Sequence, residues 1–150
     1  MQVSKVEIHQ TILHLLSESI IQATRDYDLA KESRDSDTKS SAGDKFETGR
    51  EMIQREMDKI SASIDQSKNQ LNFLSKINLN RPYSIVDLGC LIITDQDIYY
   101  ISIGLGKVEI NAELIYAISL DSPIGQIFKG KRVGDILEFR SKTLTINQLL

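Results

Sequence analysis

Cysteine is almost absent from this 150-residue chain, and proline and glycine are scarce. The single cysteine, Cys90, cannot build a disulfide framework or a zinc site of several thiolates. Its place in the apolar run 88–93 predicts a buried core thiol. No run approaches the roughly 18 apolar residues that a membrane span needs, and the first residues do not show a signal-peptide pattern. We therefore expect a cytoplasmic protein that does not enter a membrane.

A strong excess of one charge is also absent. Lysine and arginine together number 18, aspartate and glutamate number 21, and the net charge is −3. The chain therefore lacks the global basic field with which many proteins hold nucleic acid. Stand-alone DNA binding is not expected.

The few prolines and glycines are unevenly distributed. Both prolines lie in the second half, and only two of the eight glycines precede residue 80. A long charged segment without proline predicts helix. From Gly89 onward, β-branched residues and tyrosines with regular glycines predict short strands and turns. The sequence thus predicts an α+β chain, with a helical segment at 1–78 and a β-rich segment at 79–150.

The helical segment carries two narrow apolar stripes. The clearer stripe has the spacing of a coiled-coil seam and consists of Phe46, Ile53, Met57, Ile60, Ile64, Ser67, Leu71 and Leu74. The looser stripe consists of Ile8, Ile12, Leu15 or Leu16, Ser19, Ala23, and Tyr27 or Ala30. Because neither stripe can be buried alone, we expect a long antiparallel helical hairpin. The polar stretch 31–43 between them predicts a turn, with an acidic tip near 31–47.

The β-rich segment is expected to form a small, mostly antiparallel sheet with one short helix. The helix is predicted at 123–128, with Ser122 as its N-cap and Pro123 at its first position. Gly104-Leu105-Gly106 lacks the third glycine of a dinucleotide loop, so we interpret it as a hairpin turn. Strands are expected at Leu91–Thr94, Ile98–Ile103, Val108–Ile110, Leu114–Ser119, Ile136–Phe139 and Leu144–Ile146.

Two other motifs do not indicate catalysis. The stretch 125–132 has the spacing of a phosphate-binding loop, but Arg132 stands where the metal-binding serine or threonine should be. A helix stop at Gly130 explains its glycines better. His9 and His14 lie five residues apart without a nucleophile and carboxylate around them, so we interpret them as surface or seam histidines.

The acidic residues near the tip are the main candidates for chemistry. Seven acids and four bases lie between Asp26 and Glu47. Asp44 and Glu47 are three residues apart at a predicted helix start, so they lie on adjacent corners of one turn. Two carboxylates so placed can share Mg²⁺. The same spacing is a capping box, with Asp44 as N-cap. The two interpretations are compatible.

The stretch Ile118–Asp135 resembles the C-terminal signature of the Gre transcript cleavage factors, GreA and GreB. The matching residues are Ile118, Ser119, Ser122, Pro123, Ile124, Gly130, Lys131, Gly134 and Asp135, with Phe128 in a hydrophobic slot. Because the C-terminal domain of that family is FKBP-like, the resemblance implies such a fold for 79–150.

The predicted hairpin tip also resembles that of the Gre factors, which carry Gly-Asp-x-x-Glu there. Gly43, Asp44 and Glu47 keep this spacing. The family continues with Asn-Ala-Glu-Tyr, whereas this chain continues with Thr-Gly-Arg-Glu at 48–51. The two acids therefore match and their surroundings differ.

The resemblance implies a mechanism that depends on RNA polymerase. Gre factors insert the hairpin into the secondary channel of the polymerase, where the tip acids help to bind an active-site Mg²⁺ at the 3′ end of the nascent RNA. By this resemblance, Asp44 and Glu47 would assist the metal, and Asp121, Ser122 and Pro123 would belong to the loop that docks on the channel rim. The chain would have no cofactor of its own and would stimulate the nuclease of the polymerase rather than act as an enzyme alone.

Two alternatives remain. The changed tip, with Lys45 and Arg50, leaves room for a secondary-channel regulator or inhibitor that does not cause cleavage, whereas the retained Asp44 and Glu47 favour cleavage. A coiled-coil scaffold whose β-rich segment binds an unrelated partner is the hypothesis from another class.

Overall fold

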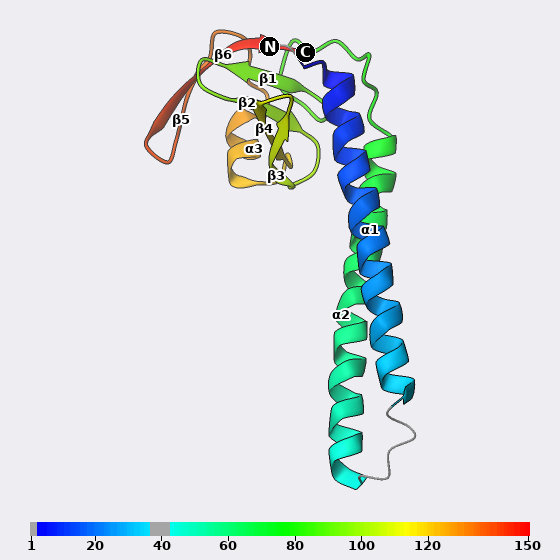
Figure 1. Ribbon diagram of the computed structural model, residues 1–150. Coiled ribbons are helices and arrows are strands. Elements are labelled where there is room, and N and C mark those ends of the chain that lie inside the picture. The colour runs from blue at the N-terminus through cyan, green and yellow to red at the C-terminus, as the bar shows by residue number, and fades with distance from the viewer. Residues whose placement is uncertain (1–2, 37–42) are drawn as a thin grey trace. The chain divides into compact units, whose positions relative to one another are not determined.

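The structure, a computed structural model, describes residues 3–36 and 43–150, and the side chains of 43–46 lie outside that description. Two long helices precede a six-stranded sheet and one short helix, so the chain is α+β as predicted (Figure 1). The elements are α1 Lys5–Ser36, α2 Gly43–Ser75, β1 Leu91–Thr94, β2 Ile98–Ile101, β3 Gly106–Ile110, β4 Glu113–Ile118, α3 Pro123–Phe128, β5 Ile136–Phe139 and β6 Lys142–Leu149.

The chain divides into two compact units. One unit consists of residues 13–72, and the other of residues 1–12 together with 73–150. These units do not coincide with the predicted segments 1–78 and 79–150, because the first turns of α1 group with the sheet. Within the described residues, neither long helix is apolar enough to cross a membrane.

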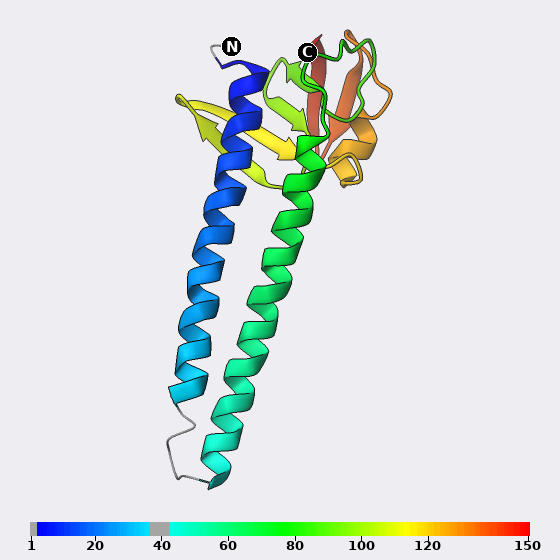
Figure 2. The same ribbon diagram turned by 90° about the vertical axis from the view of Figure 1, so that its right-hand side faces the viewer.

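Residues 13–72 form an antiparallel helical hairpin, with α1 and α2 side by side (Figures 1 and 2). The predicted seam of α2 is confirmed from Ile53 onward. Every seam residue there is buried or half-buried, and Gln70 is the one other residue between 50 and 75 that is not exposed. Phe46 lies outside the described side chains. The three-and-four spacing thus places one face of α2 against α1.

The predicted seam of α1 is partly wrong. Leu16 is buried and Leu15 is exposed, which settles the first ambiguity. Ser19 is exposed, and the half-buried residue is Ile20. The buried positions 8, 12 and 16 and the half-buried position 20 follow each other in steps of four, so the alternation of four and three begins only after Ile20. Further along, Ala23, Tyr27, Ala30 and Arg34 are half-buried.

Helix α1 extends further into the predicted polar turn than expected. Helix α1 continues to Ser36, so residues 31–36 are helical rather than part of a polar loop. These polar residues have ordinary helix propensities, and contact with α2 extends the helix beyond its last apolar seam position. Residues 37–42 lie outside the description.

The sheet has the strand order β3-β4-β2-β1-β6-β5. Four of the five pairings are antiparallel, as predicted, and β2 pairs with β4 in parallel. Because β4 lies between β2 and β3, the prediction of a hairpin turn at Gly104–Gly106 is wrong. This segment crosses from β2 to the outer side of β4, and Gly106 there has a φ of +86°.

The central strands β1 and β2 are covered on both faces, and strand β2 shows how. Tyr99 faces α3, where its ring lies 4.9 Å from that of Phe128 between ring centroids. Tyr100 points to the opposite face, where its hydroxyl lies 2.8 Å from Nδ1 of His9 in the first turns of α1. The predicted core thiol, Cys90, is confirmed, because it is fully buried. Burial raises its pKa to about 11.

His9 is therefore a buried histidine of the sheet's unit, rather than a surface or seam residue. Burial lowers its pKa below the ordinary value of 6.5, and the nearby Lys5 ammonium adds to this effect. The folded protein thus keeps His9 neutral, while the unfolded chain takes up a proton below about pH 6.5. Its contribution to stability is complete above that pH and declines as the pH falls toward the lowered pKa.

We expect the stability difference between wild type and His9→Gln to shrink as the pH falls below about 6.5. Urea unfolding measured across this range checks the expectation. His14→Gln, altered at an exposed histidine of the same helix, is the matched control. A difference that does not change with pH would contradict a neutral, buried His9.

Candidate functional site

The two predicted tip acids lie at the start of α2. The helix begins at Gly43, so Asp44 is its second residue and Glu47 its fifth. Asp44 is thus in the first helical turn rather than at the capping position before it, a two-residue difference at a helix end. The side chain of Asp44 lies outside the description, so its capping and metal-binding roles stay predictions. The macrodipole favours an acid at Asp44, within the first turn.

Glu47 is exposed and lines a depression of about 320 Å³ with Arg50, Glu51 and Gln54. Three and four residues separate these side chains from one another along the helix, so they share one face. A carboxylate at this place can accept hydrogen bonds or bind a cation, with the positive charge of Arg50 nearby.

The two helices are linked close to the tip by polar groups. Nη1 of Arg34 donates to the amide oxygen of Gln54 over 2.7 Å, and Nη2 of Arg34 lies 3.1 Å from Oδ1 of Asp35. The amide nitrogen of Gln54 donates to Oδ1 of Asp58 over 3.0 Å. The sequence did not indicate this link, although Arg34 falls at a seam spacing after Ala30. The link fixes the lateral position of the helix that carries Glu47.

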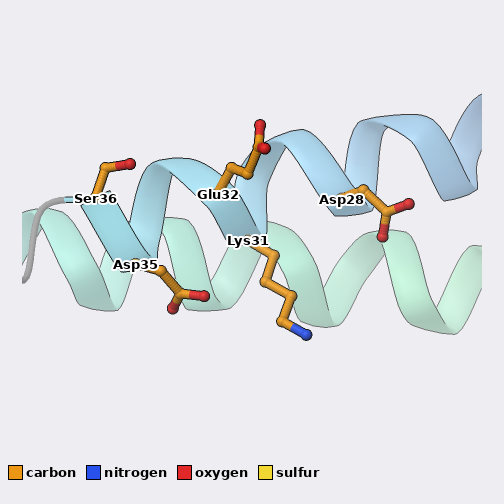
Figure 3. Close-up of a pocket in the computed structure, with 5 residues that line it drawn as sticks. All are labelled: Asp28, Lys31, Glu32, Asp35 and Ser36. Carbon is orange, nitrogen blue, oxygen red and sulfur yellow. The ribbon is translucent and has the colours of Figure 1, made fainter.

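Figure 3 shows a second, acidic depression on α1, of about 500 Å³. Its side chains do not converge: Asp35 and Lys31 point to one side of the helix, while Glu32 and Ser36 point to the other (Figure 3). Among the described residues, no three histidines, cysteines or acids come together as metal ligands. A metal at this end of the hairpin would need ligands beyond those described.

The predicted docking loop precedes α3, where Ser122 is the N-cap and Pro123 the first residue, as expected. The Ser122 hydroxyl accepts from the Gly125 amide over 3.1 Å and donates to the Ser119 carbonyl over 2.7 Å. Asp121 and Pro123 are exposed and Ser122 is half-buried. The serine oxygen is thus engaged within the loop, while the two flanking side chains are available at the surface. The docking role of the three residues stays a prediction.

Ser122→Ala is expected to destabilise the sheet's unit by about 1 kcal/mol, because it removes both hydrogen bonds of the cap. Asp121→Ala, at an exposed neighbour, should change stability by less than about 0.5 kcal/mol. Thermal unfolding of the two variants makes the comparison. Equal stabilities would show that the cap is not structural.

The near-match to a phosphate-binding loop is excluded by the backbone. Residues 125–128 are helical, so their amides bond within α3 instead of surrounding an anion. Gly130 follows the helix with a φ of +75°, which supports its predicted role as a helix stop.

No protein-family model and no curated protein matches the chain. Among solved structures, the chain is similar to one described as "Structure of the transcription factor Gfh1". The two are 17% identical, the alignment covers 91% of this chain and 92% of the other, and the TM-score is 0.37. A likeness at this level carries no argument about function.

Proposed function

We propose that this chain is an RNA polymerase accessory factor that stimulates Mg²⁺-dependent cleavage of nascent RNA in stalled elongation complexes. The observation that carries the proposal is the position of the Asp44–Glu47 pair at the tip end of a two-helix hairpin. The resemblance of Ile118–Asp135 to the Gre signature supports the same partner. The hairpin enters the secondary channel, and the loop of Asp121, Ser122 and Pro123 docks on its rim.

In this account the chain positions carboxylates and the polymerase supplies the rest of the site. Asp44 and Glu47 offer oxygen ligands and can accept hydrogen bonds from the attacking water. If Mg²⁺ is held there by these acids together with polymerase ligands, it would stabilise the attacking and leaving oxygens of the RNA. The seam of α2 and the Arg34–Gln54 hydrogen bond hold the backbone that carries Glu47. The chain therefore is not an enzyme by itself.

The test is RNA shortening in stalled complexes of the cognate polymerase. Wild type is expected to cause rapid, Mg²⁺-dependent shortening. Asp44→Asn/Glu47→Gln should lower the rate roughly 100-fold while the chain still binds polymerase, because the loss of positioned carboxylates typically costs this much. Glu51→Gln, an exposed acid in the same depression as Glu47, is the matched control and should retain most activity. Undiminished cleavage by the double variant would refute the assigned role.

A regulator without cleavage activity is the second candidate, and the position of Arg50 favours it. The guanidinium shares the depression of Glu47, and a cation there competes with Mg²⁺ for the carboxylate. Under this alternative, wild type binds polymerase and slows RNA synthesis without shortening the RNA. Failure to bind polymerase at all would favour the scaffold hypothesis, and turnover of a substrate by the purified chain alone would contradict the accessory role.

A further inference from the structure

The two edges of the sheet end in similar hairpins but differ in what they expose. Strand β3 forms one edge and β5 the other. Each hairpin closes with two residues of positive φ, Asn111–Ala112 for β3–β4 and Arg140–Ser141 for β5–β6. These turns fix the register of both hairpins, and therefore which backbone groups of each edge strand face outward.

On β5 the outward backbone groups belong to Ile136 and Glu138. Phe139 and Lys142 close the two-residue turn as a hydrogen-bonded pair, so Leu137 with Leu144 is the next such pair. The N–H and C=O groups of Ile136 and Glu138 therefore point away from β6. Nothing in the described part of the chain hydrogen-bonds to them. By the same register, Lys107 and Glu109 carry the outward groups of β3.

Ile136 distinguishes β5 from the β3 edge. It is 69% exposed, the highest value for any large hydrophobic residue that the structure describes, and Val133, three residues earlier in the chain, is 57% exposed. Protein edges are usually blocked by charged side chains. The β3 edge follows that rule, with Lys107 and Glu109 at both outward positions. The β5 edge combines open backbone groups with an exposed aliphatic side chain.

Backbone hydrogen bonds to β6 hold the turn before β5. The Gly134 amide donates to the Ile146 carbonyl over 2.8 Å, and the Ile146 amide donates to the Asp135 carbonyl over 3.0 Å. Gly134 has a φ of +93°, so these residues form a glycine-type β-bulge. The Asp135 carboxylate also accepts from the Arg132 amide over 2.8 Å.

The charges around β5 indicate what kind of segment would bind there. Lys131 and Arg132 precede the strand and Arg140 lies in the turn after it; all three are exposed, and none makes an ion pair with a described residue. Two acids lie between them: Glu138 is exposed, and Asp135 is half-buried and engaged with the Arg132 amide.

We propose that the β5 edge, formed by Ile136 and Glu138 and flanked by Lys131, Arg132 and Arg140, binds an extended acidic segment of a partner protein as an added strand. The segment carries an aliphatic residue that packs on Ile136 and acids that meet the flanking cations. This inference does not depend on a polymerase partner.

The probe is a short fluorescent peptide with aspartates at both ends and valines between them, titrated with the full chain. It should bind roughly tenfold more tightly than a matched peptide with lysines in place of aspartates, and Arg132→Glu/Arg140→Glu should reverse this preference. Equal binding of the two peptides, or no binding, would overturn the proposal.

A proline at each edge separates strand addition from general charge attraction. Glu138→Pro removes an outward N–H without breaking a bond to β6, and it should abolish binding of the acidic peptide. Glu109→Pro makes the same change on the β3 edge and should leave binding intact. Equal effects of the two substitutions in folded variants, as judged by circular dichroism, would refute the β5 site. Dimers of wild type that Glu138→Pro dissolves would show that the occupant is a second copy and would also overturn it.

Discussion

Gly125→Ala is expected to destabilise the sheet's unit by about 3 kcal/mol or more. A Cβ atom at this position would lie 2.1 Å from the Ser119 carbonyl oxygen and 2.8 Å from that of Leu120. Both are backbone atoms, so no rotamer change relieves the overlap. The Ser119 carbonyl also accepts from the Ser122 hydroxyl, so moving it disrupts the α3 cap.

Urea unfolding compared with Gly104→Ala measures this effect. A Cβ at Gly104 would meet nothing within 4 Å, so that substitution should change stability by less than about 0.5 kcal/mol. Unfolding of the two variants at the same urea concentration would contradict the close approach of Gly125 to the carbonyl oxygens of Ser119 and Leu120.

Met57→Ala is expected to cost about 2–5 kcal/mol in the helical hairpin. Met57 is 1% exposed and lies in the middle of the α2 seam, so its removal leaves a cavity between the helices. Because a two-helix hairpin has few other buried side chains, this loss should open residues 13–72 first. Amide hydrogen exchange along α1 and α2 reports the opening directly.

Met52→Ala is the matched control, since the same side chain is 66% exposed five residues earlier on α2. It should change the free energy of opening that hydrogen exchange reports for the hairpin by less than about 0.5 kcal/mol. Equal acceleration of exchange by both variants would show that the seam is not where the hairpin is stabilised.

The α2 seam and the α3 cap were predictable because both are set by local sequence. A three-and-four period needs one partner helix to bury it, and Ser122-Pro123 is favourable at a helix start in almost any context. The N-terminal part of α1 followed a different rule. There Ile8, Ile12 and His9 are buried within the unit that contains the sheet. A seam spacing that assumes a helical partner does not apply there, which is why Ser19 was wrongly predicted to lie in the seam.

The parallel pairing of β2 with β4 could not be read from the sequence. Strand order depends on contacts between distant segments, and the glycines of 104–106 are as compatible with a crossover as with a hairpin turn. The His9–Tyr100 hydrogen bond joins residues 91 positions apart, beyond any local pattern. The tip acids were identifiable as a local motif, but the Arg34–Gln54 link near them depends on how the two helices align.

The most direct test of the proposed function locates the hairpin tip within the polymerase complex. Cys90 is fully buried and its pKa is raised to about 11, so thiol-reactive reagents will modify an introduced surface cysteine selectively. An iron chelate attached at Glu47→Cys generates hydroxyl radicals that cut polymer chains close to the tip. The same chelate at Asp121→Cys is the control for the rim loop.

We expect the Glu47→Cys chelate to cut polymerase segments around the catalytic Mg²⁺ and the 3′ end of the nascent RNA, and the Asp121→Cys chelate to cut only the outer rim of the secondary channel. Cuts from the Glu47→Cys chelate that are confined to the polymerase surface, or absent although the chain binds, would contradict the proposal that the tip acids act at the active site.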